Sequence, residues 1–127
     1  MSYDFNDHQP IYLQLLEIFK IAIANASWTS GSKVDSVRNL ALQYGVNPNT
    51  VQRALQELER EGLAYTERTA GRYITEDNER IRSLRQTLGE LETQRFVQHM
   101  QELNMTEDSS IEMIRKHWER NKEDKND

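Results

Sequence analysis

The stretch GVNPNTVQRAL, residues 45–55, places turn-forming residues directly before a helical pattern. Gly45 suits the position with positive φ that follows many helices, and the Asn-Pro-Asn run suits the start of a new helix. The apolar residues that follow recur at helical spacing: Val51, Ala54, Leu55 and Leu58. The stretch therefore predicts the end of one helix, a turn of about three residues, and a second helix that reaches about Glu61.

The residues before this stretch predict the first of the two helices. Asp35 and Ser36 are both good N-cap residues. The apolar side of the helix that follows consists of Val37, Leu40, Ala41 and Tyr44. Two short helices joined through Gly45 form the helix-turn-helix pattern, in which the second helix enters the major groove of DNA.

Two further elements flank this pair. PIYLQLLEIFKIAIANA predicts a helix that ends near Asn25, with Pro10 at its first position and a broad apolar face. TSGS, residues 29–32, has the composition of a turn. After Gly62, the segment LAYTERTAGRYIT alternates apolar and polar residues around a turn at 68–71. This pattern predicts a two-stranded hairpin, the wing of a winged helix.

Composition excludes several classes of function. The 127 residues contain no cysteine, which removes disulfides, thiolate metal sites and cysteine nucleophiles. No apolar run approaches the roughly 20 residues of a membrane span, and no secretory signal is present. We found no nucleophile–base pair, phosphate-binding glycine loop or paired-carboxylate motif, so we expect no enzyme and no cofactor. These features are compatible with a cytoplasmic protein.

The net charge of −5 is unfavourable for nucleic-acid binding as a whole, but the charge is unevenly distributed. Residues 1–75 contain 7 Lys or Arg and 8 Asp or Glu, whereas residues 76–127 contain 9 and 13. Between Lys33 and Arg53, Asp35 is the one acidic residue against three basic ones. Binding responds to the local field of a patch more than to the total charge. The net charge therefore does not exclude a DNA-binding surface.

The residue types at the start of the second helix suit base recognition. Asn and Gln pair with adenine, Arg pairs with guanine, and Thr contacts a phosphate or a thymine methyl group. Each of these side chains could equally cap a helix or lie in solvent, and their occurrence together with a wing favours DNA. The predicted DNA-binding residues are Ser36, Arg38, Asn47, Pro48, Asn49, Thr50, Gln52, Arg53, Arg68, Gly71 and Arg72.

Beyond about residue 76 the chain is rich in Glu, Arg and Gln and has helical periodicity. We expect residues 1–76 to form the winged helix-turn-helix domain, residues 77–120 a two-helix segment, and residues 121–127 a disordered tail. The first helix would span about 79–103, and the second would begin near Thr106. An apolar seam without a domain to cover it favours dimerisation, although it could instead fold back on its own winged helix. The predicted dimerisation residues are Ile81, Leu84, Leu88, Leu91, Phe96, Met100, Leu103, Ile111, Ile114 and Trp118.

Residues 9–75 resemble the DNA-binding domain of the GntR family of transcriptional regulators, and GVNPNTVQRALQELEREGL is typical of it. The short C-terminal part is similar in size to the YtrA-like branch of this family. The resemblance implies a dimeric bacterial repressor of a pseudo-palindromic operator, often that of a transporter operon. It also implies DNA contacts from Arg38, from residues 47–53 and from the wing tip.

The sequence departs from the family pattern at two places. Val34-Asp35-Ser36 stands where Leu-Pro-Ser is usual, so a carboxylate lies near the expected phosphates. The wing has Arg68-Thr69-Ala70-Gly71 instead of Arg-Gly-x-Gly, and the loss of the first glycine restricts the backbone. Both changes affect the expected strength of the DNA contacts.

Three other interpretations remain. The chain could be a winged-helix module for protein–protein interaction that docks through its acidic C-terminal helices. Met113 and Trp118 could line a pocket for a small-molecule effector, whose identity the sequence does not reveal. His99 and His117, on different predicted helices, could approach each other as metal ligands, although packing and solvent exposure are the more ordinary roles.

Overall fold

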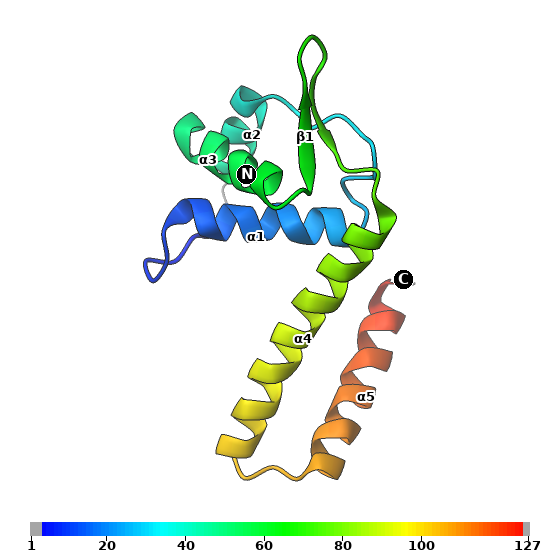
Figure 1. The fold of residues 1–127 in the computed structure, drawn as a ribbon. Coiled ribbons are helices and arrows are strands. Elements are labelled where there is room, and N and C mark those ends of the chain that lie inside the picture. The colour runs from blue at the N-terminus through cyan, green and yellow to red at the C-terminus, as the bar shows by residue number, and fades with distance from the viewer. Residues whose placement is uncertain (1–3, 126–127) are drawn as a thin grey trace. The chain divides into compact units, whose positions relative to one another are not determined.

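The computed structural model describes residues 4–125. Its elements follow the order α1 (Ile11–Ala24), α2 (Val37–Tyr44), α3 (Pro48–Arg60), β1 (Ala64–Glu67), β2 (Gly71–Ile74), α4 (Asn78–Glu102) and α5 (Glu107–Lys125) (Figure 1). The predicted fold class, a mainly helical winged helix followed by two helices, is confirmed. The chain divides into two compact units between Thr87 and Leu88, so the first turns of α4 belong to the winged-helix unit.

Local hydrogen bonds explain where α2 and α3 begin. The Oγ atom of Ser36 accepts a 3.0 Å hydrogen bond from the backbone N–H of Asn39. The Oδ1 atom of Asn47 accepts a 2.8 Å hydrogen bond from the N–H of Asn49. Gly45 ends α2 with φ at 67°, a left-handed conformation that favours glycine. The predicted helix-turn-helix is therefore present.

The start of α1 differs from the expectation. Pro10 was predicted at the first helical position, but its ψ of 140° makes it the N-cap, and the helix begins at Ile11. The Pro10 carbonyl nonetheless accepts hydrogen bonds from the N–H groups of Leu13 and Gln14. A proline at this position costs nothing in hydrogen bonds, because the N-cap N–H has no partner within the helix.

The wing is an antiparallel hairpin in which Ala64 pairs with Ile74 and Glu67 with Gly71. A third segment, residues 31–34, forms backbone hydrogen bonds with β2 of this hairpin. Val34 N–H donates to the Arg72 carbonyl at 2.9 Å, and Ile74 N–H donates to the Ser32 carbonyl at 2.9 Å. The sequence predicted only a turn here, because a short polar segment gives no strand signal. In Figure 1 the tip of the hairpin projects past α2, away from α1.

The core of the winged helix lies among α1, α2, α3 and the base of the wing. Its largest fully buried side chains are Leu15, Phe19, Ile23, Leu40, Val51, Leu55, Leu58 and Ile74. Ile81 on α4 belongs to the same core at 7% exposure, and Leu84 packs against it. The assignment of Ile81 to a dimer interface is therefore wrong. The winged helix closes its core only with the first turns of α4.

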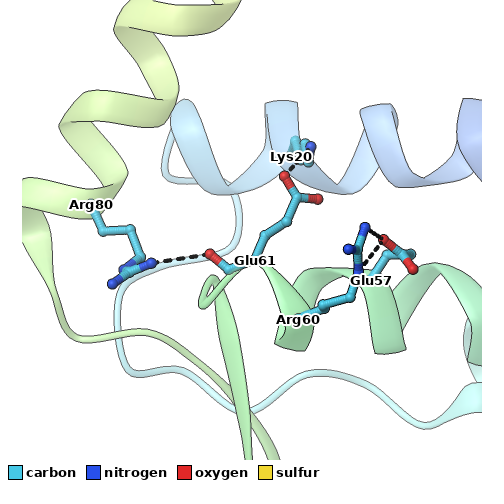
Figure 2. Close-up of polar contacts among 5 residues, drawn as sticks. All are labelled: Lys20, Glu57, Arg60, Glu61 and Arg80. Atoms are coloured by element: carbon cyan, nitrogen blue, oxygen red, sulfur yellow. Dashed lines mark hydrogen bonds and ion pairs between the residues drawn. The ribbon is translucent and has the colours of Figure 1, made fainter.

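Polar contacts fasten the base of α4 to the ends of two other helices. Arg80 donates from Nη1 to the carbonyl of Glu61, just beyond α3, at 3.1 Å. Arg85 donates from Nε to the carbonyl of Ala24, the last residue of α1, at 2.9 Å. The Glu61 side chain turns the other way, toward Lys20 of α1, at 2.7 Å (Figure 2). Each arginine thus satisfies a carbonyl that the helix itself leaves without a partner.

The C-terminal unit consists of the rest of α4 and α5, joined by a short turn in which Asn104 has φ at 58°. Thr106 caps α5 by accepting a 3.1 Å hydrogen bond from Ser109 N–H. We expected a disordered tail from residue 121, but α5 continues to Lys125, in keeping with the high helix propensity of Lys and Glu. Residues 126–127 lie outside the described range. Within residues 4–125, no helix has the length and apolar content needed to cross a membrane.

Candidate nucleic-acid interface

The start of α3 presents a run of polar side chains. Asn47, Pro48 and Asn49 are exposed, while Thr50 and Gln52 are half-buried. The cap places Pro48 at the first helical position, where its missing N–H has no consequence. The first N–H groups of a helix carry partial positive charge, which attracts phosphates. The N–H groups of Asn49 and Thr50 are already bonded to Asn47, so this end of α3 attracts a phosphate through its partial charge and offers amide side chains to base edges.

The start of α2 supplies a second set of predicted residues. Asp35 holds this turn by accepting hydrogen bonds from Ser36 N–H at 2.8 Å and from the Asn39 side-chain amide at 3.0 Å. Its carboxylate thus supports the Ser36 cap, and does not itself cap the helix. Arg38 in the first turn of α2 is exposed, and its guanidinium makes no hydrogen bond or ion pair within residues 4–125. Arg38 is therefore available to an anion such as a phosphate.

Arg53 is held by α1. Its guanidinium carbon lies 3.7 Å from the centre of the Tyr12 ring, within the range of a cation–π contact. Arg53 therefore lies on the side of α3 that faces α1, whereas Glu59, on the other side, contacts the wing. The sequence grouped Arg53 with Gln52 as residues that read bases. The stacking gives Arg53 a second role, linking two helices.

The two arginines of the wing, Arg68 and Arg72, differ in whether their side chains have a partner within the described residues. Arg68 at the tip is exposed and makes no hydrogen bond or ion pair within the described part of the chain. Arg72 is half-buried, and its Nε donates to Glu59 Oε1 on α3 at 3.1 Å. Gly71 has φ at 114°, and a β-carbon there would lie 3.0 Å from Cε of Lys33. Gly71 thus permits both the backbone conformation of the turn and the close approach of the Lys33 side chain.

A cleft of about 740 Å³ lies between the wing and the segment that leads into α2. It brings together three predicted residues, Ser36, Gly71 and Arg72, with others that the sequence did not indicate. Its lining is Lys33, Val34, Asp35, Ser36, Val37, Thr66, Gly71 and Arg72. We did not predict Lys33, Thr66 or Glu59 as site residues. Their roles depend on contacts between segments far apart in the chain.

The carboxylates at the C-terminal end of α3 are each paired with a cation. Arg60 donates to Glu57 Oε2 from Nε at 2.9 Å, and this hydrogen bond lowers the pKa of the Glu57 carboxyl (Figure 2). The other two pairs join α3 to the wing and to α1 through Glu59–Arg72 and Lys20–Glu61. Pairing offsets the negative charge beside the recognition surface.

The C-terminal unit contains an open groove of about 780 Å³ between α4 and α5. Its lining is Phe96, Met100, Met113, Ile114, His117, Trp118, Asn121 and Lys122. Trp118 is 72% exposed, and Leu103, near the turn, is 69% exposed. Four of the predicted dimerisation residues thus line this groove: Phe96, Met100, Ile114 and Trp118. Met113 and Trp118, weighed as effector contacts, line it as well.

The two histidines weighed as metal ligands, His99 and His117, are on α4 and α5. His117 lines the groove, whereas His99 is not part of its lining. Within residues 4–125, no group of three or more histidine, aspartate or glutamate residues is placed to hold a metal ion. The structure gives the proposed histidine pair no support.

Comparison with known proteins agrees with the geometry. The family described as "Bacterial regulatory proteins, gntR family" matches residues 11–74, which span α1 to the end of the wing. The HTH-type transcriptional regulator YhcF of Bacillus subtilis (strain 168) is 36% identical over 115 residues, which cover 91% of this chain and 95% of YhcF. The HTH-type transcriptional repressor YtrA of the same organism is 44% identical over 68 residues, or 54% of this chain and 52% of YtrA.

A solved structure extends the similarity beyond the winged helix. A GntR family transcriptional regulator from Listeria monocytogenes superposes with a TM-score of 0.81 at 37% identity. The match covers 88% of this chain and 98% of the Listeria chain. The similarity therefore extends beyond the winged helix into the two-helix C-terminal part.

Proposed function

This chain belongs to the GntR family of bacterial regulatory proteins and is a DNA-binding transcriptional regulator, and we propose that it acts as a homodimeric repressor of a pseudo-palindromic operator. The similarity to the repressor YtrA supports repression and a place in the YtrA-like branch. Control of a transporter operon is part of the same proposal. Since a bacterial operator lies in the cytoplasm, so would the protein.

One observation carries the proposed operator contacts. Arg38, Gln52 and Arg68 come from α2, α3 and the wing tip, and none of their side chains makes a hydrogen bond or ion pair within residues 4–125. Gln52 is suited to an adenine edge, and the two arginines to phosphates or a minor groove. The remaining proposed contacts are Ser36, Asn47, Pro48, Asn49, Thr50 and Gly71. Arg53 and Arg72 are held by Tyr12 and Glu59 and are proposed to act mainly within the protein.

The exposed apolar side chains of the C-terminal unit support dimerisation. A two-helix hairpin cannot enclose a core by itself, and a surface with Phe96, Ile114 and Trp118 along one groove is typical of an interface. A two-fold dimer buries the same groove of both chains and presents two copies of α3 to one duplex. The proposed interface comprises Leu88, Leu91, Phe96, Met100, Leu103, Ile111, Ile114 and Trp118.

The proposal is tested by selecting duplexes from a random pool with the purified protein, in parallel with an Arg38→Ala variant. We expect the native chain to enrich a two-fold-symmetric site, and the variant to recover less duplex at the same protein and salt concentrations. If no sequence is enriched at low salt and the two proteins behave alike, the proposed operator binding is wrong. A role of the acidic C-terminal helices in docking a protein partner would then be favoured.

A further inference from the structure

Glu59 of α3 contacts both strands of the wing through one carboxylate oxygen. Its Oε1 atom accepts a hydrogen bond from the Thr66 hydroxyl on β1 and one from Arg72 Nε on β2, the latter at 3.1 Å. Thr66 and Arg72 are directly opposite each other in the hairpin. A single oxygen therefore holds a cross-strand pair against the recognition helix. We call these three residues the wing clasp.

The wing clasp is partly shielded from solvent. The side chains of Arg72 and Glu59 are 17% and 27% exposed. The Glu57–Arg60 pair, by contrast, lies within one helix, and its arginine side chain is 74% exposed. Solvent and salt screen an exposed pair strongly and a half-buried one less. Unlike Glu57–Arg60, the Glu59–Arg72 pair of the wing clasp joins two elements, so it can restrain the wing relative to α3.

The position of the wing clasp links it to both parts of the proposed interface. Gln56 lies four residues after Gln52, and Glu59 lies three residues after Gln56, so the three side chains share one stripe of α3. At the other end, the next pair of the hairpin is Glu67 with Gly71, beyond which the turn carries Arg68. The wing clasp thus lies between the stripe that would read bases and the exposed tip.

We propose that Glu59 and Arg72 are positioning residues that fix the wing at one angle to the recognition helix. In this arrangement Arg68 meets the flank of the half-site that α3 reads, and Arg72 serves Glu59 instead of a phosphate. The inference rests on the proposed operator binding, because the wing angle matters only where the wing and α3 bind the same duplex. It also requires that Glu59 and Arg72 act as a unit.

The first test compares Glu59→Ala, Arg72→Ala and the double variant on the selected duplex. Each single change is expected to weaken binding roughly tenfold, the loss of one charge-assisted hydrogen bond, and the double variant to weaken it no further. Hydroxyl-radical protection should disappear from the flank of each half-site and remain over its centre. Glu59→Gln keeps an acceptor oxygen and should restore much of the protection. Glu57→Ala is the matched control and should leave the flank protected.

The second test needs no DNA. Amide hydrogen exchange of the native protein should be slow in residues 64–74 and faster in the Glu59→Ala and Arg72→Ala proteins, with little change for Glu57→Ala. If the alanine variants do not fold, Thr66→Val removes one hydrogen bond with little change of shape and should show a smaller change of the same kind. Slow exchange in every variant would overturn the wing clasp, whether or not the proposed operator binding holds.

A distinct result would assign Arg72 to DNA. In this result, Arg72→Ala lowers the slope of log K against log salt concentration by about one, while Glu59→Ala binds as tightly as the native chain. Arg72 would then contact a phosphate, and the proposal would be wrong. If the native chain binds no duplex, the proposed operator binding fails, and hydrogen exchange alone decides whether Glu59 restrains the wing.

Discussion

The guanidinium of Arg53 stacks on the ring of Tyr12, with the guanidinium carbon 3.7 Å from the ring centre. The two residues lie on α3 and α1, whose apolar faces already pack together in the core. The contact covers the ring and restrains the arginine at the edge of the helix pair. An arginine on the recognition helix is thereby used partly for helix packing.

Replacing Tyr12 tests this contact. Tyr12→Leu should lower the free energy of unfolding by about 0.5–1 kcal/mol through the lost cation–π contact. Tyr12→Phe keeps the aromatic face and should lie close to the native value. Urea unfolding of both variants measures the difference. Equal losses in the two variants would show that the ring face contributes nothing and that the hydroxyl matters instead.

Arg38 and Gln52 should affect DNA binding in different ways. Arg38→Ala should weaken binding to all sequences alike and lower the salt slope by about one, as expected for a phosphate contact. Gln52→Ala should instead relax the preference at one base pair, by about 1–3 kcal/mol. Competition among duplexes that differ at single positions, repeated at several salt concentrations, separates the two effects. If Arg38→Ala instead relaxes the preference at one base pair and leaves the salt slope unchanged, Arg38 contacts a base edge.

Gly62 and Gly89 should respond in opposite ways to alanine. Gly62 has φ at 76°, and a β-carbon there would collide with Nη1 of Arg80, so Gly62→Ala should destabilise the protein by about 1–3 kcal/mol. Gly89 lies in α4 with open space around it, so Gly89→Ala should stabilise the protein by about 0.5–1 kcal/mol. Thermal and urea unfolding measure both changes. A neutral Gly62→Ala variant would mean that Arg80 can leave the Glu61 carbonyl without cost.

A charge in the C-terminal groove should break the proposed dimer. Ile114→Asp would bury an unpaired carboxylate and should weaken self-association roughly tenfold or more. Arg115→Gln is the matched control, because Arg115 is exposed and does not line the groove. Sedimentation equilibrium of the native chain and both variants measures the association. A dimer unaffected by Ile114→Asp would place the interface elsewhere.

The parts of this fold that could be predicted from sequence are those fixed by neighbours in the chain. The caps at Ser36 and Asn47 and the left-handed Gly45 depend on residues within a few positions: Gly45 was predicted, and Ser36 and Asn47 were among the predicted candidates for the two helix starts. The burial of Ile81 in the core of the winged helix was not predicted, because its periodicity fits a dimer seam and a domain core equally well. Its burial depends on packing against the winged helix.

The same limit applies to the candidate interface. Residue types at the start of α3 indicated DNA binding, since short polar groups there have few other uses in combination. The sequence did not distinguish the free arginines, Arg38 and Arg68, from the engaged Arg72. That distinction depends on Glu59, which lies 13 residues away and carries no motif.

The most direct test of the central claim is sedimentation velocity of the protein with its selected duplex over a range of salt concentrations. We predict two chains on each symmetric duplex, with an affinity that falls steeply as salt rises because arginines displace counterions from phosphates. One chain per duplex would contradict the proposed dimer. Sedimentation of protein and DNA as separate species at low salt would contradict operator binding itself.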